Sequence, residues 1–181
     1  MEAAIELSTQ RGYHGTTLAA IGDRCGLTTG AVYSIFGSKQ DLFIAALGEG
    51  WPAPRFADAS PPGTPLEESL RRFGETWGRK LDDPRANGVY GVALEVAAAV
   101  YRDDDVRPVM FGKSEAQRDE LARDIARRAR EAGESLPVPA VQLATLVIAA
   151  MVGLAQMRMV SGQPEPPAFG AVAAALMHLR S

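Results

Sequence analysis

The chain has 181 residues and a net charge of −3, with 46% hydrophobic and 23% charged residues. This balance is typical of a soluble globular protein, and the length suits one or two small domains. The single cysteine, Cys25, excludes an internal disulfide framework and a cysteine-rich metal site. Two histidines, His14 and His178, are too few for a histidine-built metal centre, so we expect neither a metal nor another cofactor.

The sequence contains no pattern that predicts a membrane or export signal. No apolar run approaches the ~18 residues that a membrane span requires. The N-terminus, MEAAIELSTQRG, is acidic and amphipathic, unlike a signal peptide. We therefore expect a cytoplasmic chain without a membrane partner. The mild acidity alone disfavours a nucleic-acid partner.

The segments in chain order predict an all-α fold of about nine helices. Ala, Leu, Arg, Glu and Met fill the long segments, and Gly and Pro separate them. Strand-like alternation of apolar and polar residues is scarce. The expected helices span residues 2–11, 17–24, 28–35, 39–50, 65–81, 85–102, 106–132, 139–160 and 167–179.

Some helix ends carry explicit signals. Ser38 and Asp41 have the spacing of a capping box, and Thr64 is expected to cap the helix that follows it. Gly12 and Gly133 lie where a helix C-terminus favours a left-handed residue. These signals fix the expected starts and ends of the helices beside them.

The Pro-rich segment 52–63, PAPRFADASPPG, predicts a loop, and its pattern leaves open whether this loop is ordered. The charged stretch LARDIARRAREAGE, near residues 121–134, predicts a mostly solvated helix.

Residues 16–43, TTLAAIGDRCGLTTGAVYSIFGSKQDLF, have the pattern of a helix-turn-helix. A short helix is followed by Gly26, which suits a tight turn that needs positive φ. Leu27 is expected to fill the corner between the two helices, and Thr28 is expected to cap the second helix.

The second short helix has small polar residues at its start, as a recognition helix in the major groove needs. Two threonine hydroxyls suit base edges, and a glycine beside them permits a close approach. A tyrosine hydroxyl, a lysine and the free backbone N–H groups of two neighbouring helix N-termini can bind phosphates. The candidate DNA contacts are Thr17, Thr28, Thr29, Gly30, Tyr33 and Lys39.

Many spaced residues between positions 3 and 47 follow one family pattern. They are AAIEL, Gly12, Tyr13, Thr16, Thr17, Ile21, Gly26, Leu27, Thr28, Gly30, Tyr33, Phe36, Lys39 and Leu42. With these residues the segment resembles the TetR family of transcriptional regulators. The resemblance implies a helix-turn-helix DNA-binding domain of three helices in residues 1–47 and a helical ligand-binding and dimerisation domain in residues 48–181.

The resemblance also implies a mechanism. A TetR-like homodimer binds a palindromic operator in double-stranded DNA, and a small ligand changes the spacing of the two DNA-binding heads and releases the DNA. By their positions in the family pattern, four residues look like DNA contacts: Thr28, Thr29, Tyr33 and Lys39. Thr17 and Gly30 are expected to lie near phosphates. Departures from the family pattern include Ser8, Gly22, Cys25 and Ile35. Cys25 is expected to be a small buried hydrophobe.

The C-terminal region differs from the rest in composition. Residues 136–181 hold only three charged side chains, and segments 139–160 and 167–179 are apolar on nearly every face. Such helices are buried all round in a folded protein. One chain of this size cannot cover both, so we expect a homodimer through these two segments. A core within one chain is the alternative.

A ligand pocket has weaker support. Aromatic and methionine residues recur at helical spacing in the middle of the chain, although ordinary core residues give the same pattern. If they line a pocket, they favour an apolar or aromatic effector. These candidates are Phe73, Trp77, Tyr90, Leu94, Tyr101, Met110 and Phe111.

Three classes of function remain to be compared. We favour a ligand-responsive repressor, and the alternative is an all-helical dimeric module that binds protein rather than DNA. We expect no enzyme, since the sequence has no catalytic triad, paired catalytic carboxylates or phosphate-binding loop. Residues 1–50 hold three basic and five acidic residues, so we expect weak non-specific DNA binding with a shallow salt dependence.

Overall fold

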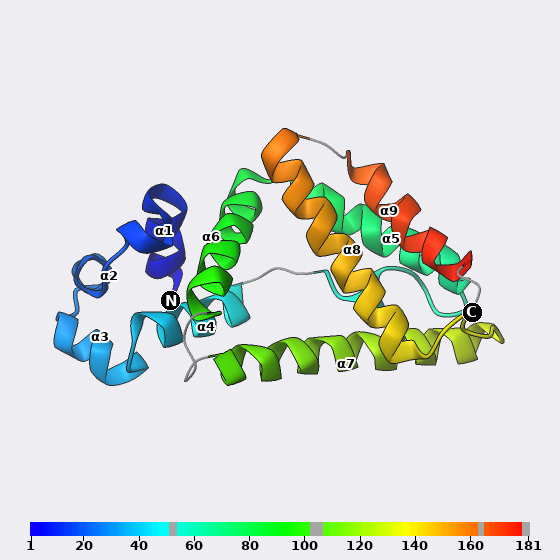
Figure 1. The fold of residues 1–181 in the computed structure, drawn as a ribbon, viewed down its shortest axis with the longest axis horizontal. Coiled ribbons are helices and arrows are strands. Elements are labelled where there is room, and N and C mark those ends of the chain that lie inside the picture. The colour runs from blue at the N-terminus through cyan, green and yellow to red at the C-terminus, as the bar shows by residue number, and fades with distance from the viewer. Residues whose placement is uncertain (51–53, 102–106, 163–164, 179–181) are drawn as a thin grey trace. The chain divides into compact units, whose positions relative to one another are not determined.

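The computed structural model describes residues 1–50, 54–101, 107–162 and 165–178, without the side chains of 49, 50, 107–111 and 113. Every regular element in these ranges is a helix, which confirms the all-α prediction (Figure 1). The α-helices are α1 (Glu2–Gly15), α2 (Leu18–Cys25), α3 (Thr29–Phe36), α4 (Lys39–Gly50), α5 (Leu66–Lys80), α6 (Pro84–Val100), α7 (Arg107–Ala132), α8 (Ala140–Ser161) and α9 (Pro166–Ala175). Two 3₁₀ turns, Phe56–Asp58 and Leu176–His178, complete the described elements.

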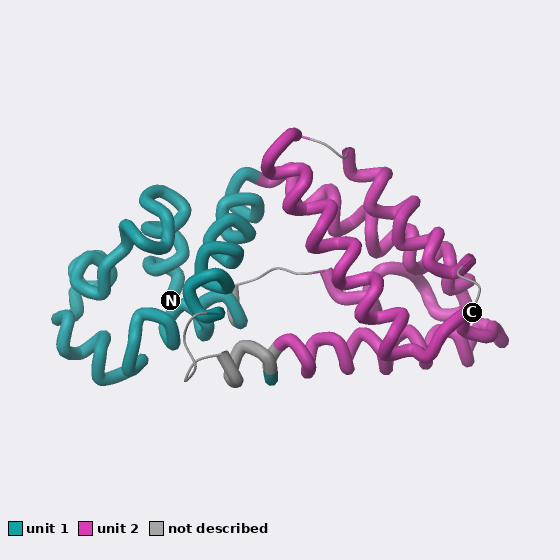
Figure 2. Tube along the Cα trace, in the orientation of Figure 1, with its two compact units in different colours: residues 1–52, 84–112 teal, residues 53–83, 113–181 magenta. Residues whose placement is uncertain are grey.

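The chain forms two compact units, shown in different colours in Figure 2. Unit 1 comprises residues 1–52 and 84–112, and unit 2 comprises residues 53–83 and 113–181. Helix α6 therefore packs with the N-terminal helices, although residues 53–83 of unit 2 precede it in the sequence. The functional boundary at residue 47 stays a prediction.

The core of unit 1 joins α1 to α4 and α6. Its central side chains are fully or almost fully buried and are mostly aliphatic. Tyr13 of α1 packs edge-on against Phe43 of α4, with 5.0 Å between the ring centroids. This contact confirms the expectation that Tyr13 is a core residue. The buried set comprises Ala4, Leu7, Tyr13, Ile21, Val32, Leu42, Phe43, Ile44, Val92, Val96 and Val100.

Helix α1 contains a kink at Gly12, where φ is +72°. The sequence predicts the left-handed glycine correctly, but it places the helix end there, whereas one more turn follows to Gly15. The freed backbone N–H of Tyr13 donates a hydrogen bond of 2.8 Å to Oε2 of Glu95 on α6. A carboxylate from another helix therefore satisfies the group that the kink exposes.

Unit 2 is built on a close approach of α5 and α9, which lie side by side in Figure 1. A Cβ added to Gly74 would overlap the carbonyl oxygen of Phe169, and one added to Gly170 would lie 2.6 Å from the carbonyl oxygen of Arg71. Helices α5 and α9 can approach this closely only because both surfaces lack side chains at these points. Small residues of α9 therefore serve packing within the chain, which is part of the alternative to a homodimer that the sequence left open.

The Pro-rich loop is ordered over residues 54–63. The guanidinium of Arg128 on α7, only 5% exposed, donates hydrogen bonds to the carbonyl oxygens of Pro61 and Ser60, the latter at 2.9 Å. The hydroxyls of Ser60 and Ser69 lie 2.7 Å apart and are buried. Because these hydrogen-bond partners come from α5 and α7, the loop is held by contacts that no local sequence pattern reveals.

Most helix ends agree with their predicted signals. Ser38 accepts from the N–H of Asp41 at 3.0 Å and donates to its carboxylate, which confirms the capping box. Gly133 has φ +69°, as expected of a C-terminal cap. The predicted cap at Thr64 is wrong, because its hydroxyl donates to the carbonyl of Pro61. The N–H of Leu66 instead donates to the carboxylate of Glu134 at 3.1 Å.

The packing of α7 corrects one prediction, whereas the packing of α8 agrees with another. Helix α7 has a buried stripe of Leu121, Ala122, Ile125, Arg128 and Ala129, so it is amphipathic rather than mostly solvated. Helix α8 buries only one stripe of small and apolar residues within one chain, in agreement with the expectation that a single chain cannot cover it.

The remaining face of α8 is exposed and apolar in a single chain. Its large exposed residues are Val141, Leu146, Val152, Met157, Met159 and Val160. Contrary to the prediction that no segment is apolar enough, α8 has the length and composition to cross a membrane. A core or interface helix of a soluble protein passes the same test, so this is weak support for a membrane span.

Candidate nucleic-acid interface and ligand cavity

The helix-turn-helix is shaped by two threonine caps and a glycine turn. Thr17 Oγ1 accepts from the N–H of Ala20, and Thr28 Oγ1 accepts from the N–H of Ala31, both at 3.1 Å. Between the two helices Gly26 adopts φ +70°, which reverses the chain without a Cβ clash. The predicted turn and the predicted cap at Thr28 are therefore confirmed.

The turn lies directly on α2. The N–H of Leu27 donates to the carbonyl of Gly22 at 2.8 Å, and a Cβ added to Gly22 would lie 2.7 Å from the carbonyl oxygen of Leu27. Gly22, a departure from the family pattern, thus permits this close approach in the present geometry.

The start of α3 is open to solvent. Thr28, Thr29 and Gly30 are all exposed, and Tyr33, one turn further on, is 60% exposed. Thr17 at the start of α2 is also exposed. Each capping hydroxyl accepts from a backbone N–H, which leaves its own proton as a donor. These residues are available to a partner, but their role as DNA contacts stays a prediction.

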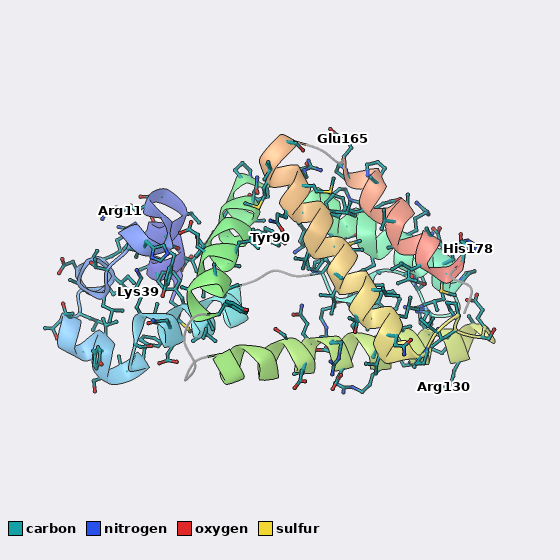
Figure 3. All side chains as sticks on the ribbon, viewed as in Figure 1. Arg11, Lys39, Tyr90, Arg130, Glu165 and His178 are labelled. Carbon is teal, nitrogen blue, oxygen red and sulfur yellow. The ribbon has the colours of Figure 1, made fainter. Side chains whose placement is uncertain are left out.

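Lys39 is half-buried and packs within unit 1, where Figure 3 labels it. Its Nζ lies 4.2 Å from the ring centroid of Tyr13 and donates to the carbonyl of His14 at 3.5 Å. Burial lowers the pKa of Lys39, and the nearby carboxylate of Glu95 partly opposes this. The ammonium therefore has partners within the protein, so any phosphate contact would share its donors.

Two expectations about exposure in this region are wrong. Leu27 does not fill the corner, since it is 44% exposed. Cys25 is exposed rather than buried. Ile35, which stands where the family pattern usually has a histidine, is 64% exposed on α3. The helix-turn-helix therefore presents apolar as well as hydroxyl side chains.

The charge around the helix-turn-helix is partly neutralised by internal pairing. Arg24 Nη2 lies 2.7 Å from Glu6 Oε1, and this hydrogen bond, with the Coulombic attraction, raises the pKa of Arg24. The pair is exposed and joins α1 to α2. Arg24 is a cation near the predicted interface that the sequence reasoning did not select, and its proximity to Glu6 depends on the tertiary fold.

Unit 2 contains a cavity of about 150 Å³. It lies among α5, α7, α8 and the ordered loop. Its lining residues are Pro54, Arg55, Phe56, Phe73, Trp77, Gln117, Glu120, Leu121, Asp124, Val147, Ile148 and Met151. Two of the predicted pocket residues, Phe73 and Trp77, are among them.

The other predicted pocket residues lie elsewhere. Tyr90 and Leu94 are on α6 in unit 1, where Figure 3 labels Tyr90, and burial raises the pKa of Tyr90 to about 12. Tyr101 follows the same helix and is 72% exposed. The side chains of Met110 and Phe111 lie outside the described residues. A role for these five residues in ligand binding stays a prediction.

Most of the cavity lining was missed from the sequence. Val147 and Met151, four residues apart on α8, had a detectable signal in their helical spacing. Phe56 lies in the Pro-rich loop, where no periodicity exists. Asp124 lies in the charged stretch 121–134, which the sequence predicted to be mostly solvated, and Glu120 directly precedes that stretch. Only the tertiary packing of α7 makes these two residues part of a cavity lining.

Comparison with known proteins connects this geometry to a family. Residues 1–46 match the model of the bacterial regulatory proteins, tetR family. The chain is also 31% identical over 94 residues to an uncharacterized HTH-type transcriptional regulator, YezE, of Bacillus subtilis (strain 168). That alignment covers 50% of this chain, and the chain spans about half (48%) of the length of this curated relative.

Solved structures share the fold over almost the whole chain. A Rhodococcus sp. protein assigned to the TetR family has a TM-score of 0.76 at 20% identity, covering 99% of this chain and 95% of that one. PfmR, a TetR family regulator from Thermus thermophilus, has a TM-score of 0.59 at 19% identity, covering 98% and 96%. A SmeT–triclosan complex has a TM-score of 0.68 at 20% identity, covering 97% and 86%. The named family and relatives are regulators rather than enzymes, as expected of this chain.

Proposed function

We propose that the chain is a ligand-responsive repressor, because residues 1–46 match the model of the tetR family and its all-helical fold resembles that of regulators assigned to this family. It binds a palindromic operator as a homodimer in the cytoplasm, and a small molecule releases it. The observation that carries this proposal is the exposed start of α3 on the segment that matches the family.

The DNA contacts are proposed from their exposure and chemistry. Thr28 and Thr29 present hydroxyls to the major groove, and Tyr33 donates to a phosphate. The N-terminus of α2 at Thr17 and the flat surface at Gly30 admit the backbone of the DNA. Lys39 contributes charge from the start of α4. Few cations take part, so specific contacts and the dimer supply most of the operator affinity.

The homodimer is proposed from the exposed apolar face of α8. Large apolar residues are exposed along this helix from Val141 to Val160 in a single chain. Pairing this face with a second copy, together with the exposed parts of α9, removes it from water as a four-helix bundle. Two copies also place two recognition helices on half-sites about 34–36 Å apart.

The effector is proposed to bind in the cavity of unit 2. Its walls are mainly apolar and aromatic, which suits a small organic molecule. SmeT, which has a similar fold, is described in complex with triclosan. A ligand releases DNA only if it binds the DNA-free conformation more tightly than the DNA-bound one.

Selection of bound fragments from random DNA by the purified full chain tests the proposal. Enrichment of a palindrome, with affinity that falls as salt rises, is the expected result. A double variant, Tyr33→Phe with Lys39→Met, should lose retention of the enriched fragment and keep the mass of the wild-type dimer. Failure to enrich any sequence would contradict the proposal.

A protein-binding module is the second candidate. It is favoured by the exposure of Leu27 and Ile35 around the turn and α3, because exposed apolar side chains are typical of protein interfaces. In that case DNA selection yields no motif, and Ile35→Ala, rather than Tyr33→Phe, weakens the protein's interaction.

A further inference from the structure

The cavity in unit 2 has an aromatic wall. The ring centroids of Phe56 and Phe73 lie 5.6 Å apart, and those of Phe73 and Trp77 lie 6.1 Å apart, both pairs edge-to-face. All three rings line the cavity, one from the loop and two from α5. An aromatic ring in the ligand can continue this arrangement, and the faces of the three rings attract a cation.

The same cavity is lined by two carboxylates. The side chain of Asp124 is only 12% exposed and lies 2.7 Å from Arg127 Nη2, whose own side chain is half exposed and does not line the cavity. Glu120 lies 3.2 Å from Arg55, the one cationic residue in the described lining, which is 68% exposed. The lining therefore carries a net negative charge.

We propose that this cavity binds a primary or secondary amine, protonated at neutral pH, that carries one aromatic ring. The ring lies against Phe73 and Trp77, and the ammonium donates to the carboxylate of Asp124. This inference rests on the proposed ligand response and narrows its effector from apolar or aromatic molecules to cationic aromatic ones.

Burial and charge favour the amine over the other ligand classes. An anion would face Asp124 and Glu120, and it would have to displace Glu120 from Arg55 to find a cation. A neutral ligand would cover Asp124 without adding a second charged partner to the one that Arg127 supplies, so the carboxylate would lose water and gain only a neutral contact. An ammonium offers a charge-assisted hydrogen bond, which is stronger than a neutral one.

The volume limits the size of the ligand. A cavity of about 150 Å³ has the capacity of those that hold benzene. One ring with a short amine substituent fits this space, with the substituent directed to Asp124. A larger ligand would extend out of the cavity or move the loop that carries Phe56.

Calorimetric titration of the wild-type chain with three ligands of one framework tests the charge preference. The ligands are 2-phenylethylamine, 2-phenylethanol and 3-phenylpropanoate, which share a ring and differ mainly in the charge of the substituent. We expect the amine to bind at least about tenfold more tightly than either of the others. Equal or tighter binding of the alcohol or the acid would overturn the inference, and so would a lack of binding by all three.

The Asp124→Asn variant tests the assigned carboxylate. We expect it to weaken amine binding about tenfold and to change alcohol binding less than twofold. Asp119→Asn is the matched control, because Asp119 lies on the same helix, pairs with Arg118 at 2.8 Å and does not line the cavity. An Asp124→Asn variant that keeps wild-type amine affinity, with wild-type melting behaviour, would refute the assignment.

The proposed repressor function and the proposed amine site can be tested separately, because the calorimetric titration is carried out without DNA. If the chain selects an operator but no amine binds, this inference fails and the DNA-binding function stands. If the amine binds in an Asp124-dependent way but no DNA is enriched, the cavity assignment stands and the proposed function fails. Adding the amine to the operator complex then shows whether occupancy releases DNA.

Discussion

Tyr33 combines an exposed ring with a hydroxyl at the position where α3 would meet the DNA backbone. Its exposure of 60% shows that the fold does not need this side chain for its core. The capping threonines differ, since Thr17 and Thr28 each bind a backbone N–H of their own helix. A substitution of either threonine therefore alters the stability of its helix as well as any DNA contact. A substitution of Tyr33 changes the proposed DNA contact without removing a helix cap.

We expect Tyr33→Phe to weaken operator binding about five- to tenfold, because one hydrogen bond to a charged phosphate is lost. Fluorescence anisotropy of a labelled operator measures this change. Ser34→Ala removes a neighbouring exposed hydroxyl and should leave affinity within about twofold. An unchanged dissociation constant for Tyr33→Phe would remove Tyr33 from the proposed contacts.

Two helix ends show how single residues act across elements. Glu95 of α6 accepts the N–H of Tyr13 at the kink of α1, and Glu134 accepts the N–H of Leu66 at the start of α5. Both carboxylates are distant in sequence from the groups they satisfy. The local rule predicted Thr64 as the cap of α5, and it fails because a tertiary acceptor replaces the local one.

At the scale of elements, α5 and α9 are joined through glycine. Residues Gly74 and Gly78 of α5 and Gly170 of α9 all lie where a Cβ would meet backbone of the other helix. The free energy of this contact comes from close packing of two backbones and the side chains around them, so a single added methyl group must separate the helices.

We expect Gly74→Ala to lower the free energy of unfolding by about 1–3 kcal/mol, because overpacking outweighs the gain in helix propensity. Gly112→Ala is the control, since a Cβ there would lie in open space within α7, and it should stabilise or leave stability unchanged. Urea unfolding followed by circular dichroism compares the two. Stabilisation by Gly74→Ala would show that α5 and α9 are farther apart.

The ordered loop depends on Arg128. Its guanidinium donates to carbonyl oxygens of Ser60 and Pro61 while almost completely buried. Phe56 of the same loop is 3% exposed and lines the cavity. Any change that releases the loop from α7 therefore also opens the aromatic wall.

We expect Arg128→Met to destabilise the chain by about 2–4 kcal/mol, because buried carbonyl groups lose a charged donor. Trypsin should then cleave faster after Arg55, at the start of the loop. Arg123→Met, on an exposed face of α7, is the control. It should change the free energy of unfolding by less than about 0.5 kcal/mol and the rate of cleavage after Arg55 by less than about twofold. Unchanged cleavage at Arg55 in Arg128→Met would mean that other contacts hold the loop.

At the scale of the whole molecule, the exposed apolar face of α8 is the surface proposed to pair with a second copy. The buried stripe of this helix includes Leu143, Val147 and Met151, which pack within unit 2. The opposite face, with Leu146 and Val152, is exposed in one chain. An exposed apolar patch of this kind is typical of an association surface, and the proposed binding to a palindrome uses two copies.

We expect Leu146→Asp combined with Val152→Asp to convert the dimer to a monomer, because two charges would be buried without partners in the interface. Sedimentation or light scattering measures the mass, and operator affinity should fall with it, since two linked heads bind more tightly than one. Arg130→Glu on the exposed part of α7 should leave the mass unchanged. A double variant that remains dimeric would place the interface elsewhere.

The sequence by itself determined the elements, because helix propensity, caps and glycine turns act locally. The helix-turn-helix, the Thr28 cap, the Ser38–Asp41 pair and the left-handed Gly12 and Gly133 were all predictable from residues within a few positions of one another. The exposed DNA-contact candidates follow from the same local pattern, since a short helix with small polar residues at its start has no buried face there.

Only the tertiary structure decided which distant residues meet. The cavity combines Phe56 of a Pro-rich loop with Asp124 of a charged helix, and neither segment contains a periodic signal for this contact. Arg128, Glu95 and Glu134 satisfy backbone groups at least 67 residues away. Such contacts depend on how whole helices pack, which no local pattern specifies, and for this reason most of the cavity lining was missed while the helix-turn-helix was found.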